Sequence, residues 1–340
     1  MSHSLDRKSF LASMALAGAG VTLTGNSAFA HRRQPDNDPV PVGIIGLDTS
    51  HSIAFTRLIN SPQSGVPTGF KVVAAHPYGS RNLEASNSRI PGYVEQIREM
   101  GVDVVDSIDE LLQRCEVILL ETNDGHPRLD QATQVIEAGK RMFIDKPVSA
   151  SLRDTIRIYQ LAEEHGVPVW SSSSLRYMEV AQQVRHEGAA GEVLGAETYS
   201  PASLEPTHPD LFWYGIHGVE ILYTLMGTGC QSVQRIKTDG ADVVTGLWAG
   251  DRIGTFRGIR EGDAGYGGRV YGSEAILDLG DFGGYGPLLD HILDFFRTGE
   301  VPVSAEETIE LYAFMEAADE STRQQGRAVS IAEVIANARS

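Results

Sequence analysis

The stretch Phe143-Ile144-Asp145-Lys146-Pro147 decides the fold prediction. It ends a short segment, 141–144, that is apolar after its first residue, Arg141. Because proline cannot continue a hydrogen-bonded ladder, a buried strand must end there. In open α/β sheets, ligands bind outside the carboxyl ends of the strands, so we expect the Lys146 ammonium to face a ligand crevice. The alternative is a solvated lysine at a strand exit, and the alternating sequence around it favours the ligand-facing role.

Short apolar runs alternate with segments of helical periodicity in the first half of the chain. Strands are expected at 40–45, 70–75, 102–105, 117–120, 141–144 and 167–171, and helices at 53–59, 93–100, 108–114, 129–138 and 152–165. Strands that are apolar on both faces and alternate with helices predict a parallel, doubly wound sheet of the Rossmann type in an α/β protein.

The pattern changes near Arg176. Several strands then follow in sequence, and Gly250-Asp251 between two of them is a hairpin signal. Expected strands end at Tyr199 or lie at 233–237, 243–248, 253–258, 269–271 and 275–279, and expected helices lie at 178–185, 215–226, 288–296 and 304–326. We therefore predict a second, α+β domain with an open, mostly antiparallel sheet. The expected boundaries are 1–30 for an export signal, 31–39 for a flexible lead-in, and 40–174 and 175–340 for the two domains.

Length and composition agree with this division. A chain of 340 residues favours two domains. Its net charge of −17 argues against a nucleic-acid partner, because no basic face could outweigh it. The two cysteines, Cys115 and Cys230, each adjoin an apolar run and are expected to be buried thiols without a disulfide.

The N-terminus has the features of an export signal. Arg7 and Lys8 precede an apolar run over 10–23, and Ala28-Phe29-Ala30 is a cleavage signature. The run is too short to span a membrane. The segment 6–11 is similar to the twin-arginine signal with Lys8 in place of the second arginine, so both that route and general secretion remain open. We expect a periplasmic or secreted protein that begins near His31.

The order of these segments resembles the glucose–fructose oxidoreductase and inositol dehydrogenase family (Gfo/Idh/MocA) from Val42 to about Val329. Four motifs carry the resemblance. They are Asp145-Lys146-Pro147 in place of Glu-Lys-Pro, Thr122-Asn123 with His126 on a T-x-N-x-x-H motif, Gly191 to Gly195 on a G-x-I-G segment, and Gly215-Ile216-His217 on G-x-H.

The resemblance implies that NAD or NADP binds across the first domain and that the second domain presents a sugar or polyol. Lys146 would polarise the reacting hydroxyl and His217 would take its proton, chemistry that needs a cation and a base near neutral pH. The cofactor residues would be Gly46, Leu47, Thr49, Ser50, His76, Arg81, Thr122, Asn123, His126 and Lys146. The substrate residues would be Lys146, Arg176, Trp213, Tyr214 and His217. No metal site is expected, because His208, Asp210 and His217 are irregularly spaced.

The sequence departs from the family at the glycine fingerprint and at two acidic positions. Asp48 and His51 replace the second and third glycines, and the second glycine normally lets the backbone approach the pyrophosphate. His76 replaces the acid on the ribose, and with Arg81 close behind it NADP is slightly favoured. Trp213 stands where the family has an acid four residues before His217.

These departures leave alternatives open. The first function is an NAD(P)-dependent oxidoreductase with a tightly held cofactor, which Lys146 and His217 favour. The second is a non-redox ligand-binding protein, which the missing glycines favour, and a glycosidase or lyase of the same fold is the third. Asp48 and His51 could pair as acid and base, or Ser50 or Asp48 could cap the helix. An interdomain ion pair is the alternative for Arg176, and the second sheet could mediate a homo-oligomer.

Overall fold

The apolar runs of the N-terminal half form a six-stranded parallel sheet in the computed structural model, which describes residues 38–61, 68–77 and 83–340. The order is β3-β2-β1-β4-β5-β6. The strands are β1 (Val40–Ile45), β2 (Phe70–His76), β3 (Asp103–Val104), β4 (Val117–Leu120), β5 (Arg141–Asp145) and β6 (Val169–Ser172). This is the strand order of a Rossmann fold, so the predicted fold class is confirmed. The expected export signal lies outside the described residues.

Helices connect these strands. They are α1 (Ser50–Asn60), α2 (Glu84–Asn87), α3 (Ile90–Glu99), α4 (Ile108–Arg114), α5 (Arg128–Glu137) and α6 (Leu152–His165). The Ser151 hydroxyl accepts the Asp154 N–H at 3.0 Å and so caps α6. Thr49 caps α1 by accepting the His51 N–H at 3.4 Å, so neither Ser50 nor Asp48 is the cap.

The C-terminal half builds a seven-stranded sheet of order β12-β11-β7-β10-β9-β8-β13. Its strands are β7 (Val193–Pro201), β8 (Cys230–Lys237), β9 (Ala241–Trp248), β10 (Arg252–Ile259), β11 (Gly267–Gly272), β12 (Ile276–Asp278) and β13 (Val329–Ser330). Only β7 and β10 pair in parallel among these described strands, so the sheet is open and mostly antiparallel, as predicted. Gly250 and Asp251 both have positive φ, which the tight β9–β10 hairpin requires.

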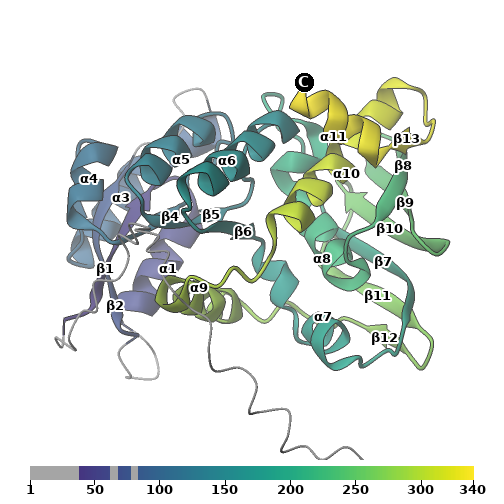
Figure 1. The fold of residues 1–340 in the computed structure, drawn as a ribbon, viewed down its shortest axis with the longest axis horizontal. Coiled ribbons are helices and arrows are strands. Elements are labelled where there is room, and N and C mark those ends of the chain that lie inside the picture. Colours follow the sequence, from purple (N-terminus) through teal and green to yellow (C-terminus); the bar gives the residue numbers. More distant parts are fainter. Residues whose placement is uncertain (1–37, 62–67, 78–82) are drawn as a thin grey trace, which may run out of the picture. The chain divides into compact units, whose positions relative to one another are not determined.

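The remaining helices pack on one side of this sheet and against the first domain (Figure 1). They are a 3₁₀ turn (Ser174–Tyr177), α7 (Glu179–Gln182) with a π-helical turn (Gln183–Glu187), a second π-helical turn (Leu211–Gly215), α8 (Ile216–Met226), α10 (Ala305–Arg323) and α11 (Ile331–Arg339). Every residue of α8 is buried. Among the described residues, α2, β13 and α11 were not expected from sequence.

Helix α9 (Gly286–Thr298) lies in the C-terminal half of the chain but packs on the first sheet (Figure 1). Its apolar side chains Leu288, Ile292 and Phe295 share a core with Val42 of β1 and Trp170 of β6. The expected boundary at residue 174 therefore does not separate the two hydrophobic cores. Cys115 and Cys230 are free and buried, as predicted. Among the described residues, no helix has the length and apolar character needed to cross a membrane.

Candidate active site

A cavity of about 420 Å³ lies at the carboxyl ends of β1, β4 and β5. This is the point at which the strand order of a doubly wound sheet reverses, where ligands of such folds bind. The first half of the chain contributes Thr49, Ser50, His51, Arg89, Tyr93, Asn123 and Lys146. The second half contributes Ser174, Leu175, Tyr214, His217, Tyr266, Phe282 and Tyr285. Six of the predicted site residues thus meet in one cavity: Thr49, Ser50, Asn123, Lys146, Tyr214 and His217.

Lys146 enters this cavity from the end of β5. Pro147 ends the strand, and the half-buried lysine side chain turns over the ring of Tyr214, with Nζ 5.5 Å from the ring centroid. Lys146 forms no ion pair with a described residue. Its ammonium therefore keeps its hydrogen-bond donors available to a ligand in the cavity.

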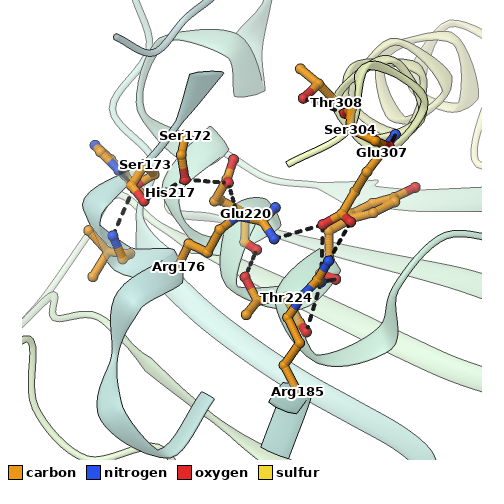
Figure 2. Close-up of polar contacts among 12 residues, drawn as sticks. Ser172, Ser173, Arg176, Arg185, His217, Glu220, Thr224, Ser304, Glu307 and Thr308 are labelled. Carbon is orange, nitrogen blue, oxygen red and sulfur yellow. Dashed lines mark hydrogen bonds and ion pairs between the residues drawn. The ribbon is translucent and has the colours of Figure 1, made fainter. Parts of the chain in front are cut away.

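His217 enters from the first turn of α8. Its Nδ1 lies 2.7 Å from the Ser173 hydroxyl, which fixes the ring (Figure 2). Burial, followed by the charges of Lys146 and His51, lowers the pKa of His217 well below its usual 6.5. The imidazole is therefore neutral at neutral pH and suited to accept a proton.

An ion-pair network holds the helix that carries His217. Arg176 donates from Nε to Glu220 at 2.6 Å and from Nη1 to Glu307 of α10 at 2.7 Å, and Arg185 pairs with the same Glu307 at 2.7 Å (Figure 2). The Ser172 hydroxyl also donates to Glu220. Arg176 is 2% exposed and does not line the cavity. The ion-pair alternative therefore accounts for Arg176 in place of the expected substrate contact.

Trp213 also lies elsewhere than expected. It falls within the π-helical turn before α8, which has more residues per turn than an α-helix and so shifts the side chains that follow. Trp213 packs against His208, with ring centroids 5.0 Å apart, and does not line the cavity. Tyr214 takes the cavity position instead, with its ring 5.2 Å from that of His217.

His51 and Asp48 do not pair with each other. Asp48 is fully buried and its Oδ1 accepts the Asn123 N–H at 2.9 Å, while burial raises the pKa of its carboxyl. His51 instead reaches Asp145 at the end of β5, with Nδ1 2.7 Å from Oδ2. Burial alone would raise the pKa of Asp145, but His51, Lys146 and Arg128 outweigh it and lower that pKa to about 2.

Two buried ionisable residues at the ends of β4 and β5, Arg128 and Glu121, were not predicted from sequence. Arg128 of α5 is fully buried and donates hydrogen bonds to the carbonyls of Thr122 and Asp145, which ties together the ends of β4 and β5. Glu121 is also fully buried, and desolvation, followed by the Asp145 charge, raises its pKa well above 4.5. Glu121 did carry a sequence signal, because acids that end neighbouring parallel strands lie at the same sheet edge.

The predicted cofactor residues of the first turn have backbone roles. Gly46 has a φ of +97°, and a Cβ there would lie 2.4 Å from the Thr122 nitrogen, so only glycine fits where β1 leaves the sheet. Leu47 and Thr122 are both fully buried. These residues shape the turn, and their side chains do not line the cavity.

Two further predicted cofactor residues lie outside the cavity lining. The Nδ1 atom of His76 lies 3.2 Å from the Val105 carbonyl oxygen. His126 is exposed and its Nδ1 lies 2.8 Å from Asp124. Arg81 lies outside the described residues.

His126, Asp124 and His208 come close enough to share a metal ion, an arrangement that the irregular spacing did not suggest. However, the Gly125 N–H donates to Nε2 of His208 at 3.1 Å. That lone pair is therefore already engaged, and the group is accounted for by its hydrogen bonds.

Some of the residues that line the cavity are suited to bind the phosphate and nicotinamide parts of a dinucleotide. The capped N-terminus of α1 opens into the cavity with Ser50 beside it and no acidic residue in its first turn, which suits a phosphate group. The Asp48 carboxyl turns away from this helix end, toward the Asn123 N–H. Ser50, Asn123 and Lys146 are thus the groups that would hold the phosphate and nicotinamide parts of the cofactor.

The doubly wound sheet, the cavity at its switch point and the second open sheet define a two-domain protein of the dinucleotide-binding oxidoreductase class. Residues 41–173 match the sequence model of the oxidoreductase family with an NAD-binding Rossmann fold, Gfo/Idh/MocA. This region of the chain belongs to that family, which confirms the resemblance and the expected enzyme class. A search of curated protein sequences gives no match.

Solved structures of dehydrogenases share the fold over most of this chain. Scyllo-inositol dehydrogenase from Lactobacillus casei, solved with NAD(H) and scyllo-inositol, is 16% identical over 87% of this chain and 100% of its own, with a TM-score of 0.68. Myo-inositol 2-dehydrogenase from Lactobacillus plantarum is 15% identical over 86% of this chain and 99% of its own, with a TM-score of 0.70. The whole described chain, not only its first domain, thus has the architecture of these proteins.

Proposed function

We propose that the protein is an NAD(P)-dependent oxidoreductase that acts on a hydroxyl group of a sugar or polyol. One observation carries the proposal: Lys146 and His217, from different halves of the chain, line the same cavity as the N-terminus of α1. The scyllo-inositol found in the Lactobacillus casei enzyme supports a cyclic polyol as the substrate class.

The residues that line the cavity have different roles in the proposed reaction. A bound nicotinamide would supply the hydride acceptor. The Lys146 ammonium stabilises negative charge on the reacting oxygen, and the neutral His217 accepts the hydroxyl proton at Nε2, because Ser173 occupies its Nδ1. Tyr214, Tyr266 and Tyr285 line the cavity and offer flat faces to the C–H surface of a ring.

The cofactor in this proposal is held tightly and recycled in place. The export signal expected in residues 1–30 supports this, because free nicotinamide cofactor should be scarce outside the cytoplasm. A protein that is exported yet needs millimolar added cofactor for each turnover would contradict it. The proposal leaves NAD and NADP as alternatives, with NADP slightly favoured by His76 and Arg81.

Native mass spectrometry of the purified protein, followed by a polyol panel monitored at the absorbance of reduced nicotinamide, tests the function. We expect a retained dinucleotide whose spectrum changes with a polyol, and loss of that change in His217→Ala. A bound small ligand without dinucleotide or redox change would instead establish the non-redox binding protein. Release of an aglycone without net redox change would establish the glycosidase or lyase alternative.

We also propose export and self-association, each with its own measurement. N-terminal sequencing of the exported protein should begin near His31, and a terminus at Met1 or Ser2 would refute export. The C-terminal sheet exposes the apolar side chains Ile236, Leu247, Ile253 and Ile276, which favours a homo-oligomer through this sheet. Light scattering should then give a mass above that of one chain, and Ile253→Lys should reduce it.

A further inference from the structure

The strongest feature that the proposed function leaves unused is the pair of His51 and Asp145. Their side chains are 10% and 3% exposed, and Nδ1 of His51 lies 2.7 Å from Oδ2 of Asp145. His51 lines the cavity, and among the described residues Nε2 has no hydrogen-bond partner. Phe55 and Tyr285 hold the ring from the sides, with centroids 5.5 and 4.7 Å away. The imidazole is therefore fixed, with one nitrogen left for a ligand.

This arrangement is that of an acid–base catalyst. A buried carboxylate on one nitrogen orients a histidine and stabilises the imidazolium that forms when the other nitrogen takes a proton. The Asp145 carboxyl is suited to this role, because its pKa of about 2 keeps it ionised at every working pH. If the contact of His51 with Asp145 only stabilised the fold, His51 would not need to line the cavity together with Lys146.

The cavity thus holds two separately supported imidazoles, His51 on Asp145 and His217 on Ser173. Transfer of hydride from an alcohol needs only one group to take the hydroxyl proton, and His217 supplies it. A second base beside the Lys146 ammonium has the components for removing a proton from a carbon next to a carbonyl group, since the ammonium stabilises the enolate oxygen that results.

We propose that the cavity also catalyses proton exchange at the carbon adjacent to a ketone, with His51 as the base and Asp145 as its positioning residue. Nε2 of His51 takes the proton from that carbon. The C–H electron pair forms the enolate double bond, and the carbonyl π-pair moves to the oxygen beside Lys146. The imidazolium then exchanges its proton with solvent water, and delivery of a solvent-derived proton from Nε2 to the carbon restores the ketone. The step is redox-neutral and needs no co-reactant. It rests on the proposed function only in that oxidation of a polyol hydroxyl yields such a ketone.

The experiment is deuterium exchange in the cyclic keto-polyol scyllo-inosose, incubated in D₂O with the protein as purified and followed by proton NMR. We expect loss of signal at the carbons next to the carbonyl well above the buffer rate. His51→Gln should slow this exchange by about 10²–10⁴-fold, and Asp145→Asn should slow it as well. His291→Gln is the control, because His291 stacks on Tyr177 outside the cavity and its loss should leave the exchange unchanged.

A second measurement avoids any folding defect of these variants. In the unsubstituted protein, the ¹⁵N resonance of His51 Nε2 should shift on addition of scyllo-inosose while Nδ1 stays hydrogen-bonded. Exchange at the buffer rate in the unsubstituted protein, equal exchange in a folded His51→Gln, or an Nε2 resonance that does not respond would each overturn the proposal. Hydride transfer acts at the carbonyl carbon and leaves its neighbours undeuterated, so failure of this proposal and failure of the oxidoreductase proposal give different results.

Discussion

The Arg176 guanidinium lies 2.6 Å from the Glu220 carboxylate, one helical turn after His217 on α8. Arg176 follows the last strand of the first sheet, so this ion pair fixes α8, which carries His217, to the sheet whose strand ends form the other wall of the cavity. Both side chains are buried, and Glu307 of α10 closes the pair from the other side (Figure 2).

Replacement of Arg176 by methionine should therefore lower the free energy of unfolding by about 3–5 kcal/mol, because it leaves Glu220 and Glu307 buried without their partner. Urea unfolding measures the change. Arg157→Met is the matched control. Its pair with Glu164 is about half exposed, so the loss should be about 0.5 kcal/mol or less. Equal losses in the two variants would contradict the structural role of Arg176.

His217 should make the protein less stable in mild acid. An unfolded histidine titrates near pH 6.5, whereas burial holds the pKa of His217 well below that value in the folded protein. Between the two pKa values the unfolded state binds more protons, so the stability falls as the pH drops below about 6.5, by at most about 1.4 kcal/mol per pH unit.

Comparison of unfolding free energies at pH 7 and pH 5 should thus show a smaller acid loss in His217→Gln than in the unsubstituted protein. Asp145 does not interfere, because its lowered pKa contributes stability that is lost only below about pH 4. Partial burial also lowers the pKa of His291, but that side chain is exposed to solvent. His291→Gln should therefore reduce the acid loss less than His217→Gln, and the reverse order would refute this prediction.

Lys146→Met should reduce turnover far more than stability. Methionine keeps the alkyl contact with Tyr214 but removes the charge that stabilises the reacting oxygen, so we expect a rate loss of about 10²–10³-fold. The free energy of unfolding should change by about 0.5 kcal/mol or less, since the side chain leaves no buried cavity. Lys140→Met, just before the other end of the same strand, is the control and should keep full turnover. A rate loss below tenfold in Lys146→Met would exclude it from the chemistry.

Trp213→Asp should not increase turnover, although it restores the acid that the family resemblance implies four residues before His217. The π-helical turn directs this position to His208, away from the cavity. The substitution removes the packing of the Trp213 ring on His208, so we expect a loss of about 1–3 kcal/mol of unfolding free energy. Steady-state kinetics and thermal unfolding test both parts, with Trp213→Phe as the control. A gain in kcat would show that the position does reach the substrate.

Sequence patterns predicted the two sheets because their signals are local. Continuous apolar runs mark the strands and Gly250-Asp251 marks a hairpin, and each of these signals acts within a few residues. The six cavity residues predicted from sequence lie just after strands or at the start of helices. Ligands of open α/β sheets bind at the carboxyl ends of the strands, so residues at such positions can be predicted. Sequence offered Asp48 as a possible partner of His51 because the two are close along the chain, whereas Asp145 comes near His51 only at the sheet edge. Tyr266, Phe282 and Tyr285 were missed because they lie in irregular segments that no periodicity places.

The return of α9 to the first sheet has a consequence for motion. The chain passes between the two sheets three times, before α7, before α9 and again before α10, because α9 packs on the first sheet whereas α10 packs on β8 of the second. A motion of the two domains that opens the cavity must therefore bend three connections at once, near 173–178, 280–285 and 299–304. A fragment that stops at residue 174 would lack the cover that Leu288, Ile292 and Phe295 give to Trp170 and Val42, so it should be prone to aggregate when expressed alone.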